Sequence, residues 1–363
     1  MRLIARLALL VLMPLLLLEF AARTMLFQYV SYSNSKSIDR QLHDLRERDD
    51  WRIVAIGDSE VRWGFDPVAF DDALAHYGLK GPTFNLAWDG FSSGLWSAVL
   101  PALSLNRDAP DLRVVLVGVQ LIESHSTISS SEHQPGVCGA LQRPVLTSSM
   151  GIEHGLDTMC EEPTWRSRVF SPLKHLAIFR YRQAIRTLIL GPGVVPAPIE
   201  FTSNSLKRSE RGYDPHSSYA DNRTDSDHNL QRMRAEKATD PKAFEPLPPE
   251  AWMSMVARGG YFDSWAQLMR RLGWTPVFFA LPTNPILIDE KDRRGDYERN
   301  SALLQDWARQ NGQIFVDLGI RDHVPMDVHY SDHRHLSVYG APIFSAELAR
   351  ALCEVPAFRD ALR

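Results

Sequence analysis

Two short segments of this 363-residue chain contain the side chains of nucleophilic catalysis. Gly57-Asp58-Ser59 directly follows an apolar run, and Asp332 and His335 lie three positions apart near the other end of the chain. Residues three apart come to the same side of a helical turn. A carboxylate that orients an imidazole, which accepts a proton from a serine hydroxyl, is the arrangement of a hydrolase triad. Each segment alone is more typical of a structural turn, so it is the pair that indicates catalysis.

The elements that must bring these segments together follow from the hydrophobic pattern. Short apolar runs alternate with amphipathic segments, which predicts an α/β fold with a parallel sheet of about five strands. Helices on both faces of the sheet would make three layers, α/β/α. Catalytic groups of such folds lie at the carboxyl ends of the strands. The predicted strands are 51–56, 83–87, 113–119, 275–281 and 313–318, and the predicted helices begin at Asp66-Pro67 and cover 93–105, 251–272, 297–310 and 337–352.

Residues 121–250 interrupt this alternation, and we predict that they form a large insertion in a domain of residues 51–363. The part from 191 to 249 is dense in Ser, Asp, Arg and Pro, and a loop that long is either functional or disordered. One helix is predicted over 171–190, with a basic face that contacts lipid headgroups or simply solvent. Cys138 and Cys160 form a disulfide or remain free thiols, and the sequence leaves both alternatives open.

The first 30 residues contain the most apolar segment. A leucine-rich run, 7–18, follows Arg2 and Arg6. A helix over 7–30 would be about 36 Å long, enough to cross a hydrocarbon core of about 30 Å. We expect an uncleaved signal anchor over 1–30 and a polar stalk over 31–50, with the rest of the chain outside the cytoplasm. A cleaved signal peptide and a buried helix are the alternatives.

Composition excludes several classes of protein. Hydrophobic residues make up 44% and charged residues 23% of the chain, which suits a folded core. The net charge of −4 provides no basic field to hold a polyanion, so we expect no nucleic-acid partner. His329, His333 and His335 lie near Asp327 and Asp332, and these residue types bind metals, but no further ligand motif accompanies them. We expect no metal and no cofactor.

At these residues the chain resembles the SGNH (GDSL) hydrolase superfamily, whose sheet is flavodoxin-like. Gly57-Asp58-Ser59 is similar to the first sequence block of the family, and the segment 332–335 is similar to the last. The resemblance implies that Ser59 is the nucleophile, His335 the general base and Asp332 the partner that orients the imidazole. His333 is the alternative general base.

The same resemblance implies an oxyanion hole. Residues 84–90 are similar to the second block, so the N–H of Gly90 would join the N–H of Ser59 as a donor. The third block normally supplies an asparagine, but the corresponding strand end has Gln120, whose side chain is longer by one methylene. The residues expected to bind substrate near this hole are Glu60, Arg62 and Asn85. In the alternative interpretation, the first two form a surface ion pair.

A narrower resemblance concerns membrane-anchored SGNH proteins of envelope polymer acylation, such as those of lipoteichoic acid D-alanyl transfer and alginate O-acetylation. It is carried by the apolar N-terminal segment, by Gly57-Asp58-Ser59-Glu60 and by 281–285 after a predicted strand. It implies a serine acyl hydrolase or O-acyltransferase of cell-envelope polysaccharide, beside a membrane-bound O-acyltransferase. The alternative is a catalytically degenerate SGNH domain that binds polymer or scaffolds such a complex.

Overall fold

The computed structural model describes part of the chain and divides it into two compact units. One unit contains 1–40 and 134–208, and the other contains 41–133 and 209–363. The predicted helix over 171–190 and the two cysteines at 138 and 160 lie outside the described residues, and so does the predicted helix over 93–105 except Trp96. The described residues are 2–21, 31–32, 41, 44–45, 48–88, 96, 109–122, 199–200, 211, 213, 235, 248–284, 291–319, 329–330 and 335–363.

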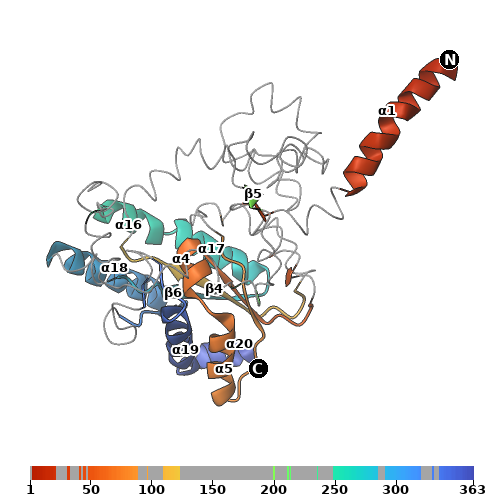
Figure 1. Ribbon diagram of the computed structural model, residues 1–363. Helices are drawn as coiled ribbons and strands as arrows, with labels where there is room; N and C mark the ends of the chain where they lie inside the picture. The colour runs from red at the N-terminus through yellow and green to blue at the C-terminus, as the bar shows by residue number, and fades with distance from the viewer. Residues whose placement is uncertain are drawn as a thin grey trace. The chain divides into compact units, whose positions relative to one another are not determined.

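A five-stranded parallel sheet forms the centre of the second unit (Figure 1). Every neighbouring pair is parallel, and each strand falls inside a run that the sequence predicts, so the predicted α/β fold is confirmed. The strands are almost continuously buried, as expected of a parallel sheet covered on both faces. In spatial order they are β3 (Thr83–Asn85), β2 (Ile53–Ile56), β4 (Val114–Val119), β6 (Thr275–Ala280) and β7 (Ile314–Val316).

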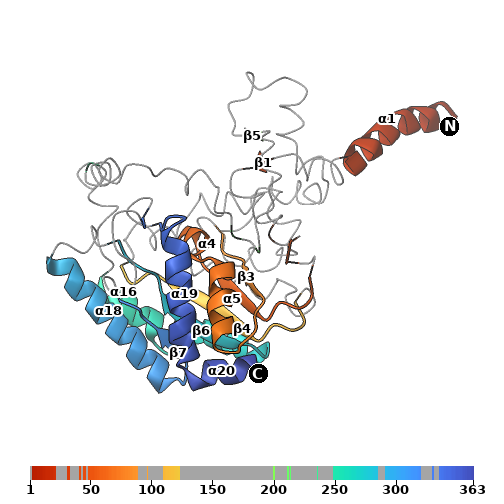
Figure 2. The same ribbon diagram turned by 60° about the horizontal axis from the view of Figure 1, so that its bottom comes forward.

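Helices cover both faces of this sheet (Figure 2). Phe279 of β6 packs against Phe344 on one face, while the preceding Phe278 packs against Phe262 and Trp307 on the other. Successive strand residues point to opposite faces, which explains the division. The first face carries α5 (Pro67–His76), α19 (Gly340–Cys353) and α20 (Pro356–Leu362), and the second carries α16 (Pro249–Val256), α17 (Tyr261–Arg271) and α18 (Lys291–Gln310).

Two predicted helices differ from those observed, and two helices, α4 and α20, are additional. The predicted helix over 251–272 is wrong as a single element, because the chain breaks between α16 and α17. Gly259 has a φ of +79°, a backbone conformation that residues with a side chain rarely adopt. A Cβ at Gly260 would lie 2.4 Å from the Ser254 carbonyl oxygen. The helix predicted over 297–310 is observed as α18, which begins earlier, at Lys291. A short helix that periodicity does not predict, α4 (Ser59–Gly64), follows β2 directly.

The first unit contains α1 (Arg2–Ala21) and a two-stranded antiparallel ladder of β1 (Ser31–Tyr32) and β5 (Ile199–Glu200). The leucines from Leu12 to Leu18 are exposed on α1. Within the described part of the chain, no helix has the length and apolar character needed to cross a membrane.

The close approach of α4 to the sheet depends on two glycines that face Val61. A Cβ at Gly57 would lie 2.2 Å from Val61 Cγ2 and 2.8 Å from Val61 Cβ. A Cβ at Gly118 of β4 would also lie 2.2 Å from Val61 Cγ2. Since real Cβ atoms do not approach that closely, only glycine at both positions lets the Val61 side chain fit against β2 and β4. The turn that begins at Ser59 is thereby held against the sheet.

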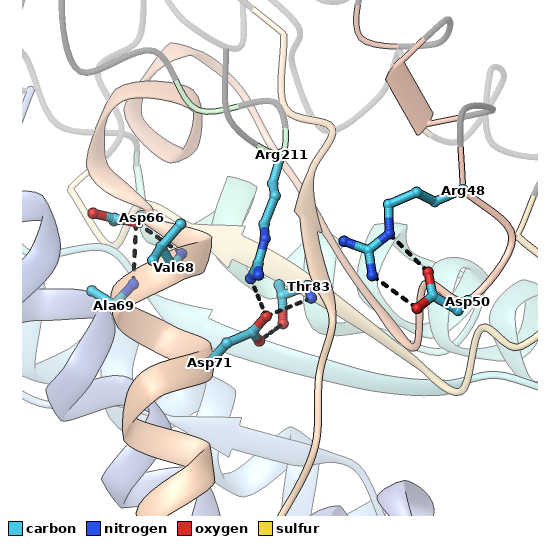
Figure 3. Close-up of polar contacts among 8 residues, drawn as sticks. All are labelled: Arg48, Asp50, Asp66, Val68, Ala69, Asp71, Thr83 and Arg211. Atoms are coloured by element: carbon cyan, nitrogen blue, oxygen red, sulfur yellow. Dashed lines mark hydrogen bonds and ion pairs between the residues drawn. The ribbon is translucent and has the colours of Figure 1, made fainter. Parts of the chain in front are cut away.

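The outer edge of β3 is closed by residues from elsewhere in the sequence. The Asn85 N–H donates to the Arg211 carbonyl (2.9 Å), and the Asn85 carbonyl accepts from Gln41 Nε2 (3.0 Å). Asp71 of α5 accepts from the Thr83 N–H (3.0 Å) and forms an ion pair with Arg211 (Figure 3). These contacts satisfy an edge that would otherwise be open to another strand, and they attach a residue of the predicted insertion to the sheet.

Figure 3 also shows how α5 begins beside this edge. Asp66 Oδ1 accepts from the N–H groups of Val68 (2.9 Å) and Ala69 (3.2 Å), and Pro67 is the first helical residue. The predicted N-cap and N1 proline are therefore confirmed. The exposed pair Arg48 and Asp50 lies on the other side of β3 in the same view.

The packing of Val61 predicts a specific rescue. Gly118→Ala should lower the free energy of unfolding by about 1–3 kcal/mol, because it overpacks the site. Adding Val61→Ala removes the Cγ2 atom that the new methyl would meet, so the double variant should lose less stability than the sum of the two single losses. Denaturant unfolding of the three variants measures this coupling.

The matched control for that cycle is Gly57→Ala with Val61→Ala. Here the Val61 Cβ would still lie 2.8 Å from the new methyl, so no comparable rescue is expected. Additive losses in the Gly118 pair, or equal rescue in both pairs, would contradict the packing described.

Asp71 predicts a pH-dependent stability difference. Burial raises the pKa of this carboxyl above its ordinary value, although Thr83 and Arg211 act in the opposite direction. A raised folded-state pKa means that the contribution of Asp71 to stability is greatest below about pH 4 and declines as the pH rises through the folded value. The unfolding free energy of wild type minus that of Asp71→Asn should therefore fall between about pH 4 and neutrality.

Asp50→Asn is a control for which the stability difference should change with pH in the opposite direction. The hydrogen bond from Arg48 lowers the pKa of Asp50, so any contribution of this exposed carboxylate appears above its unfolded pKa and is lost in acid. A difference for Asp71 that grows with rising pH would overturn the assignment.

Candidate active site

Ser59 and His335 are in hydrogen-bonding contact, although 276 positions separate them in the sequence. The Ser59 Oγ lies 2.8 Å from His335 Nε2. When Nε2 carries no proton, the hydroxyl donates to it, which is the arrangement for transferring a serine proton to an imidazole. Both residues are half-buried, so the pair retains access to solvent. The predicted meeting of the two segments is thus observed, while their chemical roles stay predictions.

The position of Ser59 follows from the end of β2 and the start of α4. Ser59 is the first residue of α4, and the preceding Asp58 caps the helix by accepting from the Glu60 N–H (2.9 Å). The first N–H groups of a helix have no partner within the helix. The Ser59 N–H, as one of these first groups, lies beside its own hydroxyl at the carboxyl edge of the sheet.

His335 is held by a short pairing of the chain with itself. Tyr330 and Leu336 form an antiparallel bridge, and the Ser337 N–H donates to the His329 carbonyl (2.7 Å). Ser337 Oγ then accepts from the N–H groups of Tyr339 and Gly340, both at 3.0 Å, at the start of α19. The backbone directly after His335 is thus held between the bridge and the hydrogen-bonded start of α19.

Gly340 is required for this arrangement. A Cβ at this position would lie 2.3 Å from the same His329 carbonyl oxygen, which is already bound to the Ser337 N–H. Asp332 and His333 lie outside the described residues, so neither the orienting carboxylate nor the alternative base is located. Among described side chains, no three histidine, cysteine or acidic residues gather as metal ligands would.

Gln120 lies directly after β4, at the same edge of the sheet as Ser59. Its side chain is buried, and within the described part of the chain its Oε1 has no hydrogen-bond partner. The next carbonyl, that of Leu121, accepts from Asn300 Nδ2 of α18 (2.8 Å), which fixes the backbone beside Gln120. A carboxamide of this kind has an N–H that suits an oxyanion. Gly90 lies outside the described residues.

Asn85 is expected from the sequence to bind substrate, but in the structure its side chain has a structural role. It is 0% exposed, and its Nδ2 donates to the carbonyls of Val61 (3.1 Å), Arg62 (3.3 Å) and Phe65 (2.8 Å). Its Oδ1 accepts from the Ala87 N–H (3.1 Å). We therefore correct this assignment: the carboxamide ends α4 and joins it to β3, and it is not accessible to substrate.

Glu60 and Arg62 differ from each other in exposure. Glu60 is buried in the first turn of α4, whereas Arg62 is half-buried, with its guanidinium 4.6 Å from the ring centre of Trp63. The sequence does not predict that Tyr330 belongs to this site, but its phenol lies near Glu60. Burial raises the pKa of its phenol, and the nearby charge of Glu60 raises it further. Nothing in the sequence marks Tyr330, because it acquires this neighbour only when the His335 segment packs against α4.

Comparison with known proteins finds no family model that matches this chain, and no curated protein sequence matches it. Function is therefore inferred from the residues and their geometry.

Proposed function

We propose that this protein is a serine-dependent acyl hydrolase or O-acyltransferase that acts on an acylated cell-envelope polysaccharide or a related polymer. The observation that carries the proposal is the 2.8 Å contact between Ser59 Oγ and His335 Nε2 at the carboxyl edge of a parallel sheet. A serine hydroxyl bound to an unprotonated imidazole nitrogen is an activated nucleophile. The SGNH-like order, with serine after the first strand and histidine after the last, also supports it.

In the proposed mechanism, Ser59 Oγ attacks the carbonyl carbon of an ester while its proton passes to His335 Nε2. Asp332 would hold the protonated imidazole through Nδ1. The N–H groups of Ser59 and Gly90, with the carboxamide of Gln120, would stabilise the tetrahedral oxyanion. Collapse breaks the bond to the leaving alcohol, which takes the proton from His335 and leaves an acyl-serine.

The second half of the reaction decides between hydrolase and transferase. His335 removes a proton from water or from a sugar hydroxyl, and the oxygen attacks the acyl-serine. Water yields a free acid, and a sugar hydroxyl yields an acylated polymer; in both cases Ser59 regains its proton. The insertion over 121–250 is the segment in which we propose that an acceptor is bound, because it leaves the sheet directly beside Gln120.

We also propose that residues 1–30 anchor the catalytic domain at a membrane, with residues 51–363 outside the cytoplasm, beside a membrane-bound O-acyltransferase. The leucine-rich composition of this segment and the exposed apolar side chains of α1 support the proposal. The proposed anchor extends beyond Ala21, the last residue of α1.

The departure at Gln120 favours a second candidate function. If its longer side chain does not reach the oxyanion, the site loses a donor that is typically worth roughly 10²–10³ in rate. The domain would then bind polymer or scaffold an acyltransferase complex without catalysing the reaction. Retention of Ser59 and His335 in contact supports the enzyme instead.

A serine-directed fluorophosphonate probe tests the enzyme proposal on the full chain. Wild type should be labelled at Ser59, Ser59→Ala should not be labelled, and His335→Ala should be labelled roughly 10²–10⁴-fold more slowly, as expected for loss of a general base. Ser264→Ala and His76→Ala are matched controls on α17 and α5, and their labelling rates should equal that of wild type. Absence of label at Ser59, or equal rates for wild type and His335→Ala, would favour the noncatalytic domain.

Membrane fractionation tests the anchor. The full chain should remain in the membrane pellet after a carbonate wash. A double variant, Leu12→Arg with Leu16→Arg, should leave the pellet, because each arginine costs about 3 kcal/mol near the centre of a membrane helix. Recovery of the mature wild-type protein in the soluble fraction would contradict the anchor and leave the site unaffected.

A further inference from the structure

Two buried donors converge on one carbonyl directly before Ser59. The Gly57 carbonyl accepts from the Trp88 backbone N–H (3.1 Å) and from the Trp96 indole Nε1–H (2.9 Å). The two indole rings lie 4.6 Å apart and tilted by 30°, and their side chains are 0% and 1% exposed. This carbonyl belongs to the residue directly after β2, immediately before the turn that leads to Ser59.

The orientation of that carbonyl determines where the turn begins. The carbonyl of Gly57 and the N–H of Asp58 belong to one planar peptide unit, so fixing one fixes the other. Asp58 caps α4, and Ser59 is its first residue. With the plane held by two donors, the direction in which the chain leaves β2 is fixed, and so is the approach of Ser59 Oγ to His335.

Among other buried tryptophans, Trp51 donates its indole N–H to the Leu45 carbonyl (2.8 Å), but two others make no such bond with any described residue. Trp252 is also 1% exposed, and Trp307 is buried between Phe262 and Phe278. Within the described residues, the Nε1 atoms of Trp252 and Trp307 have no hydrogen-bond partner. Packing alone therefore accounts for those rings, whereas the Trp96 ring makes a directed bond to the Ser59 turn.

We propose that Trp96 is a positioning residue for Ser59: its indole N–H, together with the Trp88 N–H, orients the Gly57–Asp58 peptide so that the hydroxyl meets the imidazole. The inference rests on the proposed function for its kinetic consequence. Its structural consequence, the alignment of Ser59 with His335, is independent of any reaction.

The test removes the indole N–H of residue 96 in two ways. Trp96→Phe removes the N–H together with part of the ring, and 3-benzothienylalanine at position 96 keeps the shape of the indole while sulfur replaces the N–H group. The same two replacements at Trp252 are matched controls, because that ring is equally buried and lacks the bond. Each full-length protein is labelled with the fluorophosphonate, and the maximal labelling rate is separated from the apparent affinity for the probe.

Both replacements at 96 should lower the maximal labelling rate roughly fivefold, the equivalent of one buried hydrogen bond, with the affinity for the probe unchanged. The replacements at 252 should leave both quantities at wild-type values. Equal labelling rates for the 96 and 252 proteins, with Ser59 still labelled, would overturn the positioning role and leave the proposed function intact.

A second measurement needs no reaction. NMR signals of the His335 imidazole report its contact with the Ser59 hydroxyl, and Ser59→Ala identifies the shift that follows loss of this contact. The benzothienyl residue at 96 should move the signals toward those of Ser59→Ala, while the same residue at 252 should not. If wild type proves unreactive, unchanged signals at 96 overturn the inference, and shifted signals support it even as the proposed function fails.

Discussion

The space that two glycines leave for Val61 is the constraint on which the site depends. α4 is a single short helix, and a helix of this length depends on tertiary contacts for its stability. Because a methyl on Gly57 or Gly118 would collide with Val61, the main chain of the turn lies directly on β2 and β4. Close-packed interiors transmit such displacements, so a shift of Val61 would also move Ser59.

The His335 side of the site is positioned by a different set of contacts. His335 belongs to no long helix or strand. Its place comes from a one-pair bridge, from the backbone hydrogen bond between Ser337 and His329, and from the bonds that Ser337 Oγ accepts at the start of α19. α19 packs on the same face of the sheet as α5. Ser345 Oγ of α19 also accepts from the Asp66 N–H (2.8 Å), at the end of the segment that begins with Ser59. The two halves therefore approach each other as parts of one packed layer.

Two described parts of the predicted insertion, its first residues after β4 and Arg211, lie at the sheet. The insertion begins beside Gln120 at the carboxyl end of β4, and Arg211 from its later part lies along β3, paired with Asp71 and with the Asn85 N–H. Asn85 in turn holds the carbonyls that end α4. A chain of direct contacts thus runs from Arg211, which belongs to the same compact unit as the sheet, through Asn85 to the helix that begins at Ser59.

The sequence alone determined the strands and helix ends that depend on patterns of neighbouring residues. Continuous apolar runs predicted all five strands, because a parallel strand buried on both faces has no polar side, and Asp66-Pro67 predicted the start of α5. Residue types also singled out Ser59 and His335. Tertiary structure decided the rest: the break between α16 and α17, which needs a backbone conformation that periodicity does not encode, and the inward role of Asn85, whose carbonyl partners come from α4 and the residue after it. It also decided the contact of Ser59 with His335, because a hydrogen bond across 276 positions forms only when the end of β2 and the segment before α19 have been brought to the same edge of the sheet.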